Sequence, residues 1–158
     1  MSLPPDVLHI LTHCRTVAVV GLSPKEHRDS HEVAAYMQSQ GWRVIPVNPV
    51  ASAQGLKILG ETVYPSLTEA AQHAHIDLVD CFRNSEDIPP IAQEAIGIGA
   101  KALWMQLGIA NDPAAQQARQ AGLRVVENRC LLIDHRSHQG HPDHDSFGAG
   151  QQPEPMQP

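Results

Sequence analysis

The chain has 158 residues, a length that fits one domain, and its 11 Lys and Arg against 17 Asp and Glu give a net charge of −6. An acidic chain with only two Trp, two Tyr and two Phe lacks the basic surface of nucleic-acid-binding proteins, and no apolar run reaches the ~18 residues of a membrane span. No targeting segment is visible, and three cysteines without CxxC spacing are typical of reduced thiols. We expect a cytoplasmic protein that binds neither nucleic acid nor membrane.

Short β-branched runs alternate with helical patterns along residues 1–136, which is typical of βα units that build a parallel sheet. The predicted strands are 16–20, 43–47, 76–82, 102–105 and 124–126. A helix over 6–15 precedes them, and a short turn at 130–134 follows them. With right-handed crossovers, the pattern predicts one α/β domain with a doubly wound, Rossmann-like parallel sheet, strand order 3-2-1-4-5, and helices on both faces.

Capping residues mark the starts of the helices between these strands. Asp29 and Ser66 each precede a glutamate by three residues, which is the spacing of a capping box. Asp87 is followed closely by two prolines, which fit the first turn of a helix. Asn111 starts the next helix in the same way.

Residues 137–158 contain no Leu, Ile or Val and are rich in Gln, Pro, Gly and His, so they bury too little apolar surface to offset the entropy of ordering. We predict a disordered tail after the 1–136 domain. Histidines recur there every three residues, next to aspartates, at His135, His138, His141 and His144. Such spacing can hold nickel, copper or zinc, but a solvated His-rich tail is the simpler interpretation and no metal site is predicted.

Ligands of open parallel sheets bind beyond the carboxyl ends of the strands, near the point where the strand order reverses. The predicted order places this point at the loops after the first and fourth strands. Gly21 follows the first strand and permits a tight turn, and Lys25 and Arg28 add two positive charges ahead of a helix N-terminus. The loop is a candidate anion site, with a plain turn and two solvated cations as the alternative.

Four of the eleven basic residues fall on this edge of the predicted sheet: Lys25, Arg28, Arg83 and Arg129. Positive charge concentrated in this way suits a compact phosphorylated cofactor. The second strand ends in the apolar segment 46–49, which is either a wall for a nucleobase or only a rigid strand exit. The loop has one of the three glycines of the dinucleotide fingerprint, so a nicotinamide-dinucleotide oxidoreductase is an alternative that rests on fold class alone.

Five segments together suggest a family: VAVVGLSPKEHRDSHEVAAYM, GWRVIPVNP, DLVDCFRNSED, KALWMQLGI and AGLRVVENRCLLI. With these segments in this order, the chain resembles the bacterial single-domain coenzyme A-binding proteins over about residues 5–134. More distantly, it resembles the CoA-binding domain of the succinyl-CoA synthetase α subunit. The resemblance implies a Rossmann-like fold with coenzyme A or an acyl-CoA lying across the carboxyl ends of the strands.

The resemblance also implies which residues contact the cofactor. The first phosphate-binding loop would consist of Gly21, Ser23, Pro24 and Lys25, with Arg28 beside them. The adenosine-side wall would be Val47, Asn48 and Pro49, and the diphosphate would lie near Phe82 and Arg83. The pantetheine arm would run along Met105, Gln106 and Leu107. Arg129, from the count of edge cations, completes the predicted set.

The family often has a basic residue soon after the second-strand proline, where this chain has Val50 and Ala51, so Lys57 is the candidate for the 3′-phosphate contact. No nucleophile, base and acid fall together on the edge, so we expect a non-catalytic carrier, buffer or sensor of CoA or acyl-CoA. The alternative is thiol–disulfide chemistry between bound CoA and Cys81 or Cys130, with a nearby arginine favouring the thiolate. Buried cysteines, however, more often serve as small apolar residues.

Overall fold

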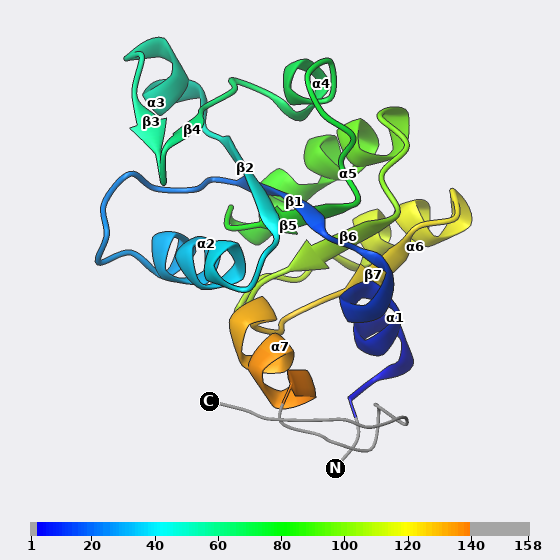
Figure 1. Ribbon diagram of the computed structural model, residues 1–158. Coiled ribbons are helices and arrows are strands. Elements are labelled where there is room, and N and C mark those ends of the chain that lie inside the picture. Colours follow the sequence, from blue (N-terminus) through cyan, green and yellow to red (C-terminus); the bar gives the residue numbers. More distant parts are fainter. Residues whose placement is uncertain (1–2, 140–158) are drawn as a thin grey trace.

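A computed structural model describes residues 3–139 of the chain. Its centre is a five-stranded parallel sheet in the order β2-β1-β5-β6-β7 (Figure 1). The strands are β1 Thr16–Val20, β2 Arg43–Val47, β5 Leu78–Cys81, β6 Ala102–Met105 and β7 Arg124–Val126. The predicted α/β class with a Rossmann-like parallel sheet is therefore confirmed.

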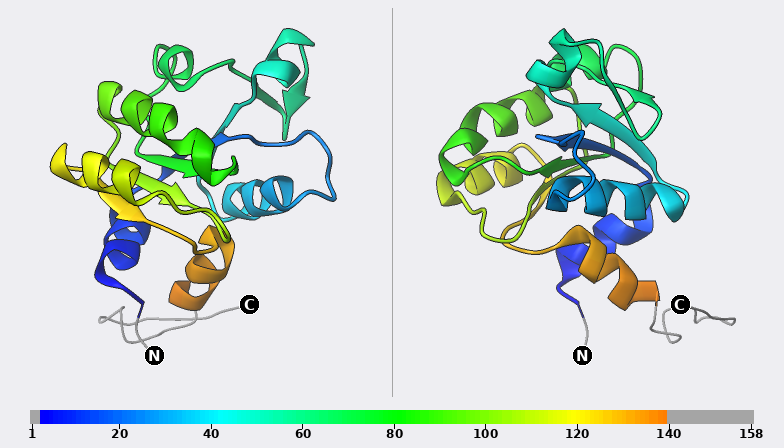
Figure 2. Two further views of the ribbon diagram at one scale, coloured as in Figure 1. Left: turned by 180° about the vertical axis from the view of Figure 1, so that it is seen from behind. Right: turned by 90° about the vertical axis from the view of Figure 1, so that its left-hand side faces the viewer.

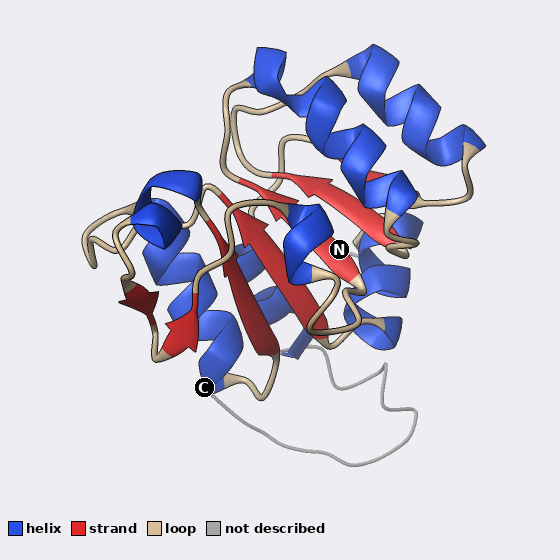
Figure 3. Ribbon diagram, turned by 90° about the horizontal axis from the view of Figure 1, so that it is seen from above, coloured by secondary structure: helices blue, strands red, loops and turns tan. Residues whose placement is uncertain are grey.

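Helices cover both faces of this sheet (Figures 2 and 3). One face packs against α1 Pro5–His13, α2 Asp29–Ser39 and α7 Leu131–Gln139. The other face packs against α4 Leu67–Ala70, α5 Ile88–Gly97 and α6 Asp112–Gln120. None of the helices within residues 3–139 has the length and apolarity to cross a membrane.

Alternate residues of each strand enter opposite apolar cores. Val17 and Val19 pack with α1, α2 and α7, whereas Ala18 and Val20 pack with α4, α5 and α6. This burial on both faces explains why the strand sequences are continuously apolar and do not alternate with polar residues.

A small excursion follows β2 and was not expected from the sequence. It consists of α3 Pro49–Ala53 and an antiparallel hairpin of β3 Lys57–Ile58 and β4 Glu61–Thr62, and Figure 1 shows it projecting from the sheet beside β2. The chain then returns at Tyr64, which forms a single bridge with Val47. The excursion therefore lies next to the carboxyl end of β2.

The strand order differs from the predicted order 3-2-1-4-5. The third predicted strand, β5, pairs with β1 in the register Val17↔Leu78, and β2 lies at the edge of the sheet. Right-handed crossovers allow either order, but Pro46 within β2 lacks an N–H and is compatible only with an edge strand. The strand order thus reverses between β1 and β5, which moves the predicted ligand crevice to the loops after the first and third strands.

The helix starts are partly as predicted. Ser66 Oγ accepts a hydrogen bond from Glu69 N, and Asn111 Oδ1 accepts one from Ala114 N, as expected of N-caps. The box predicted at Asp29 is wrong, because Asp29 is the first helical residue and the N-cap Arg28 makes no side-chain cap. The helix start predicted at Asp87 is confirmed, since Asp87 is the N-cap of α5 and a proline lies in the first turn, although its side chain makes no cap.

The boundary between domain and tail was predicted at residue 136. Helix α7 begins near the predicted final turn but continues to Gln139, three residues beyond that boundary. The remainder of the predicted tail, with His141 and His144, lies outside the described residues.

Candidate functional site

The loops after β1 and β5 approach each other closely at the point where the strand order reverses. Gly21 has a φ of +88°, and a Cβ at this position would lie 2.8 Å from the carbonyl oxygen of Phe82 and 3.0 Å from Arg83 Cδ. Position 21 therefore requires glycine for two reasons, a left-handed backbone and a close backbone contact. The sequence predicted the turn but not the contact.

The loop from Leu22 to Arg28 forms an open arc between β1 and α2 (Figure 1). Ser30 Oγ accepts a hydrogen bond from Ser23 N at 3.0 Å, and Ser23 Oγ accepts one from Lys25 N at 3.0 Å. Lys25 and Arg28 are exposed and form no ion pair with any residue of the described part of the chain. The arc leads into the N-terminal end of α2, where the helix dipole is positive. An anion bound there would therefore meet two cations and the positive end of the helix dipole.

The exit of β2 is tied to the same loop. Gly21 N donates to Val47 O, and Asn48 Nδ2 donates to Leu22 O, both at 2.9 Å. Asn48 Oδ1 accepts from the backbone N–H groups of Val50 and Ala51, which caps α3. The predicted adenosine-side wall and the predicted phosphate-binding loop are thus joined by hydrogen bonds. The side chain of Val47, however, is buried and faces the core.

Arg83 follows β5 and lies over Gly21. Its Cδ lies 3.0 Å from the place of a Gly21 Cβ, and its Nη2 lies 3.4 Å from Asp87 Oδ2. Phe82 is half-buried against the core on the side of α2. The structure therefore brings Phe82 and Arg83 together with the first loop, as the resemblance implied.

The side chains of Met105 and Gln106 face the interior and not the edge. Met105 is fully buried, and Gln106 is 3% exposed. Gln106 Nε2 donates to Asp80 Oδ2 at 3.2 Å, while Gln106 Oε1 accepts from Leu131 N at 3.2 Å. Of the three predicted pantetheine contacts, only Leu107 presents its side chain to solvent, with 61% exposed.

Hydrogen bonds between distant residues fix the turn after β6. Asn128 Oδ1 accepts from Gly108 N at 2.7 Å, and Asn128 N donates to Ile109 O. Ser85 Oγ accepts from Ala110 N at 3.1 Å. Neither Asn128 nor Ser85 was predicted from the sequence. Asn128 has a left-handed φ of 57°, which asparagine tolerates well, so an asparagine just after the fifth strand was the available signal.

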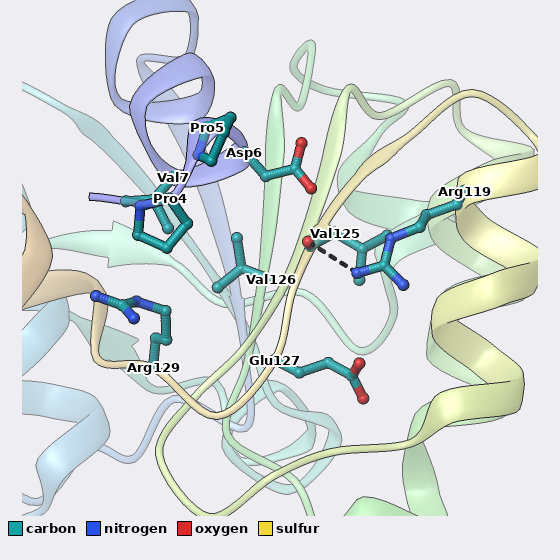
Figure 4. A pocket seen from close by; sticks show the side chains of 9 residues that line it. All are labelled: Pro4, Pro5, Asp6, Val7, Arg119, Val125, Val126, Glu127 and Arg129. Carbon is teal, nitrogen blue, oxygen red and sulfur yellow. Dashed lines mark hydrogen bonds between the residues drawn. The ribbon is translucent and has the colours of Figure 1, made fainter. Parts of the chain in front are cut away.

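The guanidinium of Arg129 forms an ion pair with a carboxylate of α7. Its Nε and Nη2 donate to the two carboxylate oxygens of buried Asp134 at 2.7 and 3.0 Å, and this hydrogen bonding raises the pKa of Arg129. Arg129 also borders a hollow of about 410 Å³ beside the edge strand β7, opposite Pro4 and Arg119 (Figure 4). Of the four cations predicted at this edge, Arg83 and Arg129 each have a carboxylate partner.

A buried carboxyl group lies beneath the edge. Asp80 is fully buried in β5, and burial raises its pKa well above the usual range, against the opposing effect of the hydrogen bond from Gln106. Within residues 3–139, Asp80 Oδ1 has no hydrogen-bond partner. The raised pKa favours the protonated form of Asp80 in the folded protein.

The two edge cysteines differ in burial. Cys81 is fully buried, and burial, together with the neighbouring Asp80, raises the pKa of its thiol well above the usual range. This is the opposite of the cation-favoured thiolate that the thiol–disulfide alternative requires at Cys81. Cys130 is half-buried.

His135, the first of the regularly spaced histidines, belongs to the core. It is 4% exposed, and its Nδ1 lies 2.9 Å from the hydroxyl oxygen of Tyr36. Burial lowers the pKa of His135 to about 4, with smaller effects from His138 and Arg15. Residues 3–139 contain no cluster of three or more His, Cys, Asp or Glu that could hold a metal ion.

Residues 15–136 match the family model described as a CoA binding domain. The uncharacterized protein YneT of Bacillus subtilis (strain 168) is 35% identical over 130 residues, which cover 82% of this chain and 92% of that protein.

Solved structures show the same fold. A hypothetical protein from Pyrococcus horikoshii OT3 has a TM-score of 0.77 at 34% identity, over 87% of this chain and 96% of that chain. The dinucleotide forming acetyl-coenzyme A synthetase 1 of Ca. Korarchaeum cryptofilum has a TM-score of 0.61 at 19% identity, over 75% of this chain and 27% of that chain. The likeness to the synthetase concerns the fold alone.

Proposed function

The chain belongs to the CoA-binding domain family, and from this membership we propose that it binds coenzyme A or an acyl-CoA as a non-catalytic carrier, buffer or sensor. The observation that carries the proposal is the close approach of Gly21 to Phe82 at the strand-order reversal, beside the unpaired cations Lys25 and Arg28. Arg83 lies over Gly21 and adds a third positive charge to the loops at the strand-order reversal, which suits a polyanion.

The proposed contacts divide by chemistry. Gly21, Ser23, Pro24, Lys25, Arg28 and Arg83 would hold the diphosphate, through backbone N–H groups and cations. Asn48 and Pro49 would border the adenosine, and Phe82 and Leu107 would contact the pantetheine arm. Val47, Met105, Gln106 and Arg129 would act mainly through the backbone that they hold in place, because their side chains are buried or already paired.

A binding role is favoured over thiol chemistry. The buried thiol of Cys81 has a raised pKa, so little reactive thiolate forms there at neutral pH. Intact mass spectrometry after exposure to CoA disulfide checks this directly. We expect no added CoA mass on Cys81 or Cys130, and an adduct on either cysteine would favour the thiol alternative.

The proposal is tested by calorimetric titration with CoA, acetyl-CoA and NAD. CoA and acetyl-CoA should bind with similar affinity, because the proposed contacts involve the nucleotide and the arm and not the acyl group. NAD should bind more weakly. Tighter binding of NAD than of CoA would overturn the proposal in favour of a nicotinamide-dependent oxidoreductase.

Lys57 gives a second test of the same site. Lys57 is exposed on β3, in the excursion that follows the predicted adenosine-side wall, so it is the proposed contact of the 3′-phosphate. Wild-type protein should bind CoA more tightly than dephospho-CoA, and Lys57→Gln should remove this difference without weakening dephospho-CoA. An unchanged difference in the variant would exclude Lys57 from this role.

A further inference from the structure

Arg83 is held by an acidic residue at the strand-order reversal. Arg83 Nη2 lies 3.4 Å from Asp87 Oδ2, four residues further along the chain, and the two side chains are 45% and 37% exposed. The aliphatic stem of Arg83 crosses Gly21, while its charged end meets Asp87. Asp87 therefore already accepts a hydrogen bond from Arg83, the cation that lies in the proposed diphosphate crevice.

The support of Asp87 is fixed by hydrogen bonds. Asp87 ends the short 3-10 helix η1 Ser85–Asp87, where Asp87 N donates to Asn84 O at 2.9 Å. Ser85 Oγ accepts from Ala110 N, and Ser85 O accepts from Asn111 Nδ2. The carboxylate thus projects from a cross-linked segment, whereas Arg83 reaches it through a long side chain with several rotatable bonds.

The other two cations of the crevice have no such partner. Lys25 and Arg28 form no ion pair within residues 3–139. A guanidinium carries five N–H donors, and the ion pair with Asp87 uses one of those of Arg83. A diphosphate offers more charge and more acceptors than one half-exposed carboxylate, so it can displace Asp87 from Arg83.

We propose that Asp87 is a positioning residue that sets the affinity of the crevice for diphosphates. It holds Arg83 over Gly21 in the ligand-free protein and gives it up when a diphosphate binds. The inference rests on the proposed function. It assigns to Asp87 a role that weakens diphosphate binding, because each diphosphate that binds must break the ion pair between Asp87 and Arg83. Removing the negative charge of Asp87 should therefore strengthen the binding of CoA and of ADP.

Calorimetric titration of Asp87→Asn with CoA and ADP tests the proposal. Asparagine keeps the shape and a hydrogen-bond acceptor, and Glu86→Gln is the matched control, since it removes the same charge from the neighbouring exposed residue. We expect Asp87→Asn to bind both ligands roughly threefold more tightly than Glu86→Gln does, the range of an exposed ion pair. Asp87→Glu should retain the wild-type affinity.

A double-mutant cycle with Arg83→Gln separates this effect from a general change in charge. In the Arg83→Gln background, Asp87→Asn should no longer strengthen binding. Equal affinities of Asp87→Asn and Glu86→Gln, weaker binding by Asp87→Asn, or a gain that persists without Arg83 would each overturn the inference. Wild-type protein that binds neither CoA nor ADP would overturn the proposed function, and the inference with it.

Discussion

The carboxyl edge of the sheet has two halves that are built differently. After β1, the segment Pro24–Arg28 is exposed and is held by few hydrogen bonds, whereas the turns after β6 and β7 are joined to each other and to Ser85 by side-chain hydrogen bonds. The cations without carboxylate partners lie in the first half, and the paired Arg129 lies in the second. If CoA binds as proposed, we expect the first half to adapt to the charged ligand and the second to be formed before the ligand arrives.

This contrast depends most on Gly21, where the adaptable half meets the fixed one. In Gly21→Ala, the new Cβ would clash with Phe82 O and would strain a left-handed backbone. We expect the free energy of unfolding to fall by about 1–3 kcal/mol and the affinity for CoA to fall more than about tenfold. Thermal unfolding and calorimetry measure the two effects.

Gly55→Ala is the matched control for this substitution. Gly55 also has a positive φ, of 70°, but no atom lies within 4 Å of a Cβ built there. Gly55→Ala should lower the free energy of unfolding through backbone strain but should bind CoA as tightly as the wild type does. If both variants bound CoA equally well, the close approach at Gly21 would not matter for binding.

The fixed half should weaken in mild acid through His135, which anchors α7. Because burial lowers its pKa to about 4 from 6.5, the folded protein binds this proton less readily than the unfolded chain. The stabilisation is complete above pH 6.5 and is lost as the pH falls towards 4, by about 2 kcal/mol at pH 4.5.

Chemical denaturation between pH 7 and 4.5 measures this loss. His135→Phe should remove most of the pH dependence in this range, whereas the exposed His13→Gln should retain it. A pH dependence that is the same in His135→Phe and wild type would show that other groups cause it.

Replacement by asparagine should have opposite effects on stability at Asp77 and at Asp80. Burial acts to raise the pKa of Asp77, but hydrogen bonds from Arg15 N and Thr16 N outweigh it and hold the pKa below its usual value. Asp77→Asn should therefore cost about 1–2 kcal/mol at pH 7. Asp80 has the opposite shift, since burial without a cation raises its pKa.

Stability that depends on protonated Asp80 is present at low pH and decreases as the pH rises above the unfolded value near 3.9. Asp80→Asn, which is neutral at all pH values, should be at least as stable as wild type at pH 7, and the advantage should shrink towards pH 4. Denaturant titrations at the two pH values compare the variants. A large loss of stability in Asp80→Asn at pH 7 would show that the carboxyl is ionised and needed.

The smallest effects are expected at the two unpaired cations of the adaptable half. Lys25→Gln and Arg28→Gln should each weaken CoA binding about three- to fivefold, with unfolding free energies within about 0.5 kcal/mol of wild type. Arg43→Gln, an exposed cation at the start of β2 and therefore at the opposite end of the sheet, should leave the affinity unchanged. Equal losses in all three variants would indicate an effect of net charge rather than of the loop.

The sequence predicted the five parallel strands, because runs such as 16–20 and 102–105 are apolar throughout and have strand length. The binding of CoA at the carboxyl edge of these strands stays a prediction. The predicted strand order 3-2-1-4-5 differs from the observed one, because it places the strand with Pro46 inside the sheet and a proline within a strand favours the edge. The contact of Ser85 with Ala110 joins residues 25 positions apart, which local patterns do not reveal. The ion pairs of Arg83 with Asp87 and of Arg129 with Asp134 are local, at spacings of four and five residues, but a count of the edge cations alone leaves such carboxylate partners out.

Asn48 sets a limit on how this family member can vary. Its oxygen accepts from Val50 N and Ala51 N while its nitrogen donates to Leu22 O. Aspartate could keep the helix cap but could not donate, and serine is too short to reach in both directions. An otherwise conservative replacement at position 48 would therefore remove one of the two hydrogen bonds that join the β2 exit to the loop after β1, and would disturb the proposed binding site while the fold stayed intact.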